Sequence, residues 1–175
     1  MNLDRTEHEE APRASSGLDM AIAVVTRLGG GLSALLLLVV LCITTLGVFN
    51  RYVLGRPLLG VDEASGFLVV AVVMFGAAEA LRRGDHIRID ILFDRAGPRG
   101  RWWLELWSQI AILVFTGLLL KAAWHTVTFS RQFEAYSTGY LEVPLWIPQS
   151  TMVIGAGLLI LAALGALLRH LRERP

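Results

Sequence analysis

The amino-acid sequence predicts an all-α integral membrane protein with four transmembrane helices. Hydrophobic residues make up 54% of the 175 residues, above the roughly 45–50% of soluble domains, and the mean hydropathy is +0.56. These residues are concentrated in long runs that are separated by short charged stretches. Each run can cross a hydrocarbon core of roughly 30 Å as a helix that rises about 1.5 Å per residue.

The chain is expected to consist of a polar tail, a membrane domain and a basic tail. Residues 1–27 mix acidic and basic side chains, and they lack the short apolar stretch and cleavage site of a secretory signal. The membrane domain covers residues 28–168, with spans at about 28–50, 61–82, 102–129 and 143–168. Residues 169–175 form the basic tail.

The first and fourth spans are uncharged, and the other two carry charges only near their ends. In the second span, Glu79 precedes Arg82 and Arg83 by three and four residues, a spacing that allows ion pairs within one helix. In the third span, Glu105 and Lys121 lie where long side chains can direct their charged groups toward the interfaces.

A glycine and three prolines mark expected helix ends. Gly84 follows the second span and is a plausible stop signal for its helix. Pro98 is expected to restart helix for the third span. Pro144 and Pro148 fit the first turns of the fourth span, where a missing backbone N–H costs least.

The distribution of arginines predicts that both termini lie in the cytoplasm. Four spans place the termini on one side of the membrane, together with the loop between the second and third spans. That side carries twelve arginines, whereas the opposite side carries three. Cytoplasmic loops carry the excess of Lys and Arg. The opposite side should therefore face outward.

The stretch LRRGDHIRIDIL, residues 81–92, follows the second span. His86, Asp90 and Asp94 are spaced four apart and would share one helix face, while apolar side chains share another. We expect a short interfacial amphipathic helix whose arginines lie near the headgroups of anionic membrane lipids. The isoleucines at positions 87, 89 and 91 also fit an extended segment.

A metal or catalytic site at these three residues is disfavoured. A transition-metal site usually needs more ligands, and the other histidines are distant in the sequence. The neighbouring arginines would also repel a cation. We therefore expect no metal, no cofactor and no catalytic residue in this chain.

The remaining composition argues against several functions. A formal net charge of only +1 gives no reason to expect nucleic-acid binding. The single cysteine, Cys42, cannot form an internal disulfide or a cysteine zinc site. No span carries a charge at its centre, which a proton relay or ion pathway usually requires. The chain is expected to be a helper or scaffold in a membrane complex and not an enzyme.

Arg51 ends the first span and Glu63 begins the second, so an antiparallel hairpin could bring them together. Charges at a membrane boundary are costly unless they are paired or hydrated. Two interpretations stay open. Both side chains simply reach water, or they form a clamp on the hairpin or a docking point for a partner.

Two stretches, FNRYVLGRPLLGVDE and FGAAEALRRGDHIRIDIL, carry a resemblance over residues 49–92. They resemble the small membrane subunit of tripartite ATP-independent periplasmic (TRAP) transporters, a family with four spans and cytoplasmic termini. The matching positions are Arg51, Glu63, Phe75, Gly76, Arg82, Gly84, His86, Ile87 and Asp90. The family often has a tryptophan three residues before the acidic residue, where this chain has Gly60.

The resemblance implies an accessory subunit of the bacterial inner membrane. In that family a periplasmic binding protein delivers an organic anion, such as a carboxylate, to a large membrane subunit that holds the substrate and sodium sites. The small subunit packs against the large one, and its outer loops are implied to help seat the binding protein. The implied subunit-contact or hairpin-orienting residues are Arg51, Glu63, Gly76, Arg82, His86 and Asp90.

Three alternatives remain at the level of sequence. The small subunit of a tripartite tricarboxylate transporter shares the size and the number of spans, but the motif after the second span argues against it. A small membrane redox or haem protein would need histidines at membrane depth, which only His125 approaches. A self-associating structural protein would be stable without a partner.

Overall fold

Four long α-helices make up most of the part of the chain that the computed structural model describes, residues 17–83 and 97–172. They are α1 (Gly17–Tyr52), α2 (Val61–Arg83), α4 (Pro98–Gln132) and α5 (Trp146–Arg172). All four are long and apolar enough to cross a membrane. Within the described ranges, extended pairing is limited to an isolated bridge between Tyr136 and Pro144. The prediction of an all-α protein with four transmembrane helices is confirmed.

The helices run beyond the spans expected from sequence. α1 has 36 residues and α4 has 35, whereas a hydrocarbon core needs about 20. Pro98 occupies the first turn of α4 as expected, because its missing N–H has no helical partner there. The expectation for Pro144 is wrong, since α5 begins at Trp146 and takes only Pro148 into its first turn. Pro144 instead pairs with Tyr136.

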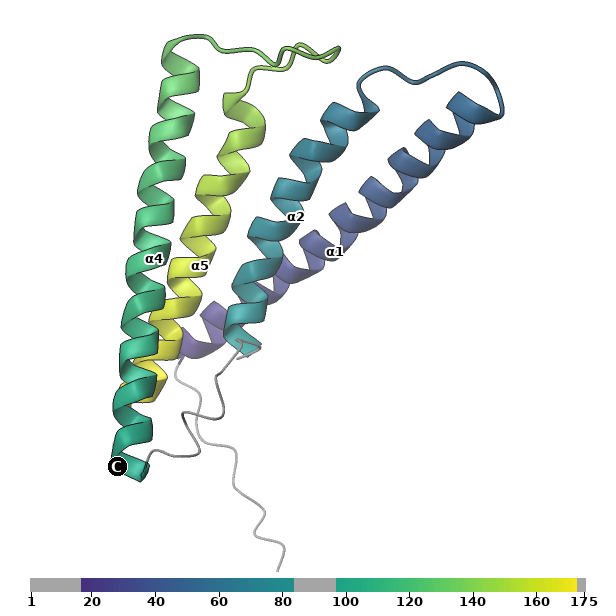
Figure 1. Ribbon diagram of the computed structural model, residues 1–175. Helices are drawn as coiled ribbons and strands as arrows, with labels where there is room; N and C mark the ends of the chain where they lie inside the picture. The colour runs from purple at the N-terminus through teal and green to yellow at the C-terminus, as the bar shows by residue number, and fades with distance from the viewer. Residues whose placement is uncertain (1–16, 84–96, 173–175) are drawn as a thin grey trace, which may run out of the picture.

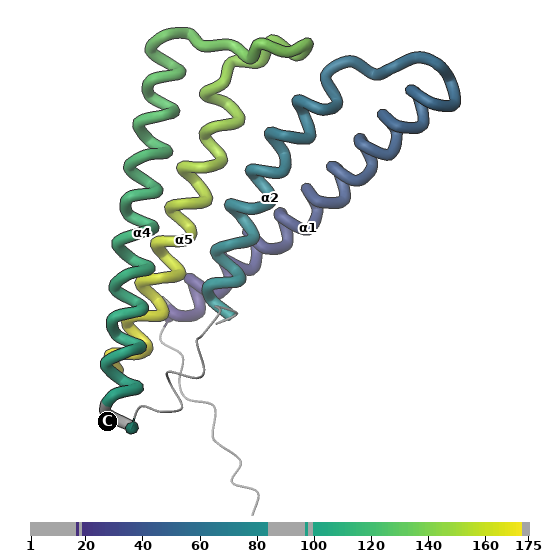
Figure 2. Tube along the Cα trace, in the orientation of Figure 1, coloured from purple at the N-terminus to yellow at the C-terminus, as the bar shows by residue number. Residues whose placement is uncertain are grey.

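The helices lie in a single row in the order α4, α5, α2, α1, except that the start of α1 crosses behind α2 and contacts α5 (Figures 1 and 2). Among the described helices, α4 packs only against α5, and α1 packs mainly against α2. Burial follows this order: the most apolar windows of α1 and α4 are 6% and 11% buried, and those of α2 and α5 are 28% and 33% buried. The two outer helices therefore present most of their surface to lipid or to a partner.

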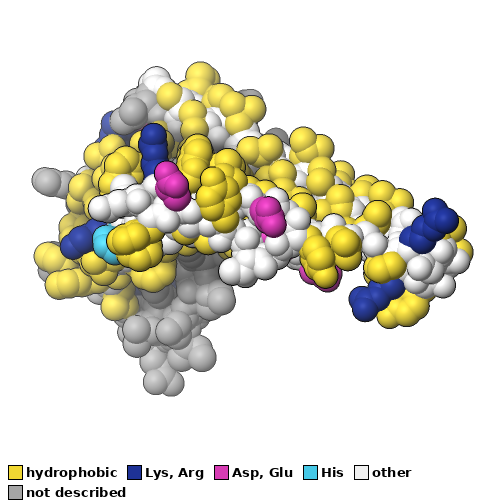
Figure 3. Space-filling view, turned by 90° about the horizontal axis from the view of Figure 1, so that it is seen from above, with side chains coloured by type: hydrophobic (Ala, Val, Ile, Leu, Met, Phe, Trp, Pro, Cys, Tyr) yellow, Lys and Arg dark blue, Asp and Glu magenta, His cyan; other side chains and the backbone are white. Residues whose placement is uncertain are grey.

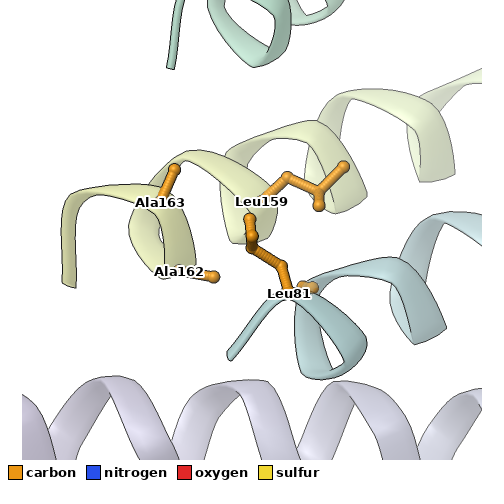
Figure 4. Close-up of a cluster of buried hydrophobic side chains, with 5 residues drawn as sticks. Leu81, Leu159, Ala162 and Ala163 are labelled. Atoms are coloured by element: carbon orange, nitrogen blue, oxygen red, sulfur yellow. The ribbon is translucent and has the colours of Figure 1, made fainter. Parts of the chain in front are cut away.

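The apolar core lies between α2 and α5. It consists of Ala78, Leu81, Leu159, Ala162 and Ala163 (Figure 4). Small residues allow this close approach, which is how membrane helices gain packing contacts. At Gly155, an added Cβ would lie 2.5 Å from the Met74 Cβ atom, so α5 contacts the α2 backbone directly.

Small residues also join α1 to α2. The Ser33 hydroxyl donates a hydrogen bond of 2.7 Å to the carbonyl of Val72. An added Cβ at Gly76 would lie 2.9 Å from the Ser33 Oγ atom. At Gly29, an added Cβ would lie 3.4 Å from the carbonyl oxygen of Phe75. This helix pair is therefore held at backbone-to-backbone distance.

The start of α1, the start of α4 and the end of α5 meet at one end of the row, which we call the terminal end. Arg172 pairs with Asp19 at 3.1 Å, and this contact joins α5 to α1. His170 Nε2 lies 3.1 Å from the carbonyl oxygen of Trp102, and the two rings stack at 5.3 Å. The opposite end, which holds the α1–α2 and α4–α5 connections, is called the loop end (Figure 1).

Candidate functional site

The α4–α5 connection at the loop end is folded back on itself. The Ser137 N–H donates to the Val143 carbonyl at 2.9 Å, and the Leu145 N–H donates to the Ala135 carbonyl at 2.9 Å. Glu134 and Glu142 adopt left-handed backbone conformations, with φ of 47° and 45°. Such turns let the chain reverse direction twice over a short distance. The result is a small hairpin whose tip projects toward the start of α2 (Figure 1).

Glu63, in the first turn of α2, binds the tip of this hairpin. Its carboxylate accepts a short hydrogen bond from the Ser137 hydroxyl and one of 3.1 Å from the Leu141 N–H. The backbone of Gly139 packs so closely on this carboxylate that an added Cβ would overlap it. We call Glu63, Ser137, Gly139 and Leu141 the loop-end latch. It connects two helical hairpins that are far apart in sequence.

Gly60 completes the contact between the two loops. Its φ of +83° is left-handed, a conformation that side chains other than glycine rarely adopt. An added Cβ would lie 2.9 Å from the Leu141 Cδ2 atom. Leu141 thus fills the space beside Gly60. Gly60 is the position at which the family that the sequence resembles often has tryptophan.

Arg51 takes no part in the latch. It lies exposed in the last turn of α1, and the ion pairs between residues of the described ranges do not join it to Glu63. The sequence left open whether Arg51 and Glu63 form a clamp. In the structure, Glu63 instead binds the α4–α5 hairpin. Seen from the loop end (Figure 3), acidic side chains lie over the middle of the molecule and basic side chains toward its two extremities.

A second polar cluster lies at the terminal end of α2. Glu79 is only 6% exposed. Arg82 donates to both of its carboxylate oxygens, at 2.8 and 2.6 Å, and Arg83 donates through Nε at 2.8 Å. We call Glu79, Arg82 and Arg83 the terminal-end cluster. It confirms the ion pairs expected from their spacing, and it satisfies a carboxylate whose burial alone would be costly.

A groove opens beside this cluster, between α1 and α2. Its volume is about 530 Å³. Gly30 lies against the aliphatic part of Glu79, where an added Cβ would be 3.0 Å from the Glu79 Cβ and Cγ atoms. The groove is lined by Arg27, Gly30, Gly31, Gly76, Glu79, Ala80 and Arg83.

The residues singled out from sequence fall in different places. Glu63 belongs to the latch and Arg82 to the terminal-end cluster, while Gly76 packs inside the chain against Ser33. His86 and Asp90, together with the expected interfacial helix, lie outside the described residues. In the ranges that are described, no group of three or more His, Cys, Asp or Glu side chains is arranged to hold a metal.

Sequence reasoning missed the hairpin residues of the latch, Ser137, Gly139 and Leu141. The only local signal is the run STG, which is typical of a turn. Nothing in that run points to Glu63, which lies 74 residues earlier in the chain.

Three curated proteins illustrate the relatives of this chain. It is 26% identical to the ectoine TRAP transporter small permease protein TeaB of Halomonas elongata, over 86% of this chain and 82% of that protein. It is 26% identical to the sialic acid TRAP transporter small permease protein SiaQ of Vibrio cholerae, over 59% and 60%. It is 30% identical to the C4-dicarboxylate TRAP transporter small permease protein DctQ of Rhodobacter capsulatus, over 60% and 46%.

A family model gives a match that covers most of the chain. Residues 40–173 match the family described as tripartite ATP-independent periplasmic transporters, DctQ component. The matched segment includes the last third of α1 and all of α2, α4 and α5. It therefore contains both polar clusters and the sequence motif that follows the second span. The chain belongs to the DctQ component family of the tripartite ATP-independent periplasmic transporters.

Proposed function

We propose that this small permease component is an accessory and scaffold subunit that packs against a large membrane transport subunit. The observation that carries the proposal is the single row of helices, in which α1 and α4 bury only 6% and 11% of their most apolar windows. A flat row offers a broad surface to a second membrane protein. A periplasmic solute-binding protein would deliver the substrate to that complex.

The proposed role is support of sodium-coupled uptake of an organic anion. The relatives are named for ectoine, sialic acid and C4-dicarboxylates, which differ in size but all carry a carboxylate. The sodium and substrate sites would lie in the large subunit. The spans of this chain support that division, because none carries a charge at its centre.

Co-purification tests the proposal. The chain would be tagged, expressed with its neighbouring genes, solubilised in mild detergent and analysed by mass spectrometry. We expect a large multi-span protein in equimolar amount. A chain that purifies alone and stable would contradict the proposal, and a haem Soret band would revive the redox alternative.

The proposed location is the bacterial inner membrane, with both termini in the cytoplasm. The pairing of Asp19 with Arg172 supports a common side for both termini. The excess of twelve arginines over three supports the cytoplasm as that side.

The segment after α2 is proposed to orient the subunit at the membrane surface or against the large subunit. His86 and Asp90 carry this hypothesis, because the family motif places them there. The double variant His86→Ala/Asp90→Ala should lower recovery of the large subunit. The matched control His8→Ala/Asp4→Ala changes the same residue types in the N-terminal tail. Equal recovery from the two variants would overturn the role of the segment.

A further inference from the structure

The groove between α1 and α2 at the terminal end combines a small-residue floor with basic sides. Gly30, Gly31 and Gly76 line it, and Arg27 and Arg83 lie at its margin. Gly31 has open space beside it, whereas Gly30 packs against Glu79 and Gly76 against Ser33. Its volume of about 530 Å³ falls in the range of small-molecule sites, roughly 300–1,000 Å³. The groove is more open than enclosed, so a ligand in it would stay in contact with the surroundings of the helices.

The two arginines mark the boundary of the hydrocarbon core on their helices. Residues 28–50, which follow Arg27, are uncharged, and Arg83 is the last residue of α2. Charged side chains at the end of a transmembrane segment are stable when they reach the layer of water and lipid headgroups. Gly30, Gly31 and Gly76 lie about one or two helical turns deeper, at the level where acyl chains begin.

The charges around the groove favour an anion. The carboxylate in its described lining, that of Glu79, already accepts hydrogen bonds from Arg82 and Arg83. Arg83 uses its Nε atom for this contact, and its side chain remains 62% exposed. Arg27 adds a further exposed guanidinium on the facing helix. Among the described residues, the groove lining thus holds two arginines, Arg27 and Arg83, and one carboxylate that is already hydrogen-bonded.

We propose that this groove binds one anionic phospholipid. The phosphate lies between Arg27 and Arg83, and the start of an acyl chain lies against Gly31 and Gly76. Phosphate suits guanidinium groups, and basic pockets between transmembrane helices bind anionic headgroups at the cytoplasmic side. An apolar helix of a partner protein could also fill the groove, but the guanidinium groups of Arg27 and Arg83 would then face an apolar surface. The inference rests on the proposed cytoplasmic placement of the terminal end.

Native mass spectrometry tests this site on the full chain, purified with whatever membrane subunit accompanies it. After delipidation, the protein is titrated with phosphatidylglycerol, with phosphatidylcholine and with inorganic phosphate. We expect one tightly retained phosphatidylglycerol, a preference of about fivefold or more over phosphatidylcholine, as electrostatic attraction to each nearby arginine predicts, and no displacement by inorganic phosphate.

Two matched pairs of variants locate the binding. Arg27→Gln should weaken phosphatidylglycerol about fivefold, whereas Arg169→Gln, at the same end but outside the groove, should not. Gly31→Leu should exclude the acyl chain, whereas Gly117→Leu should not. An added Cβ meets no atom within 4 Å at Gly31 or at Gly117, so both leucine variants should fold.

Several outcomes would overturn the site. These are equal binding of the two lipids, displacement of the lipid by inorganic phosphate, or equal phosphatidylglycerol binding by the two variants of either pair. Loss of the large subunit from Gly31→Leu with lipid binding retained would assign the groove to a protein contact. Absence of a large subunit from the wild-type preparation would instead contradict the proposed function. That result comes from a separate measurement, so the two failures are distinguishable.

Discussion

Glu79 is a buried carboxylate near the terminal end of α2. Its contacts connect the last turns of α2 with each other and with α1. Its carboxylate binds two arginines of its own helix, and its aliphatic part lies against Gly30 of α1. The ion pairs lie within α2, but α1 contributes to the burial of Glu79. A buried carboxylate needs such partners. Removing the carboxylate would leave Arg82 largely buried and without its partner.

Glu79→Leu is therefore expected to destabilise the protein by about 2–3 kcal/mol, the cost typical of losing hydrogen bonds to charged groups. Unfolding in mixed detergent micelles, followed by tryptophan fluorescence, measures this change. Glu134→Leu serves as the control, because Glu134 is exposed at the loop end. Equal stability of the two variants would show that the terminal-end cluster contributes nothing.

Gly139 tests packing at the opposite end. Gly139→Ala is expected to lower the free energy of unfolding by about 1–3 kcal/mol, as overpacking does, because the new methyl group would overlap the Glu63 carboxylate. Gly66→Ala is the control, since an added Cβ at Gly66 meets no atom within 4 Å. The same unfolding assay compares them, and a stable Gly139→Ala protein would argue against the latch.

The α4–α5 hairpin is the element that joins the two halves of the row at the loop end. α2 and α5 share their core near the terminal end, through Leu81 and Ala162 (Figure 4). At the loop end, the described contacts between these halves run from Glu63 and Gly60 to the hairpin tip. The hairpin has its own backbone hydrogen bonds, so its fold and its attachment to α2 are separable properties.

Amide hydrogen exchange distinguishes the fold of the hairpin from its attachment to α2. In Glu63→Ala, the amide of Leu141 should exchange about tenfold faster, because a hydrogen bond to a charged acceptor worth roughly 1.5 kcal/mol is lost. The amide of Ser137 should stay protected, since it donates to Val143 within the hairpin. Asp62→Ala, in the same turn of α2, is the control. Faster exchange at both amides would mean that Glu63 supports the hairpin fold itself.

At the scale of the whole molecule, the row has two distinct ends that should lie on opposite sides of the membrane. The pair of Asp19 and Arg172 places the start of α1 and the end of α5 at one end, and the latch occupies the other. Labelling with a membrane-impermeant maleimide tests their orientation after Cys42→Ala removes the native thiol. Thr138→Cys should react in intact spheroplasts, and Pro175→Cys only after permeabilisation. The reverse pattern would contradict the arginine-based topology.

The sequence predicted the parts of this architecture that depend on neighbours along the chain. The four apolar runs predicted four helices, Pro98 marked the start of α4, and the spacing of Glu79 to Arg82 and Arg83 predicted their pairing. The order of helices in the row was not predictable, because apolar runs are alike in composition. Nor was the latch, since a hydrogen bond across 74 residues leaves no periodic signal.

The single row has a practical consequence for handling the protein. Four helices side by side touch the bilayer along a longer perimeter than the same helices in a square bundle. More boundary lipids or detergent molecules must therefore solvate this chain, and the fit of that shell contributes more to its stability. Its apparent melting temperature should depend strongly on detergent chain length and should rise when a partner replaces part of the shell.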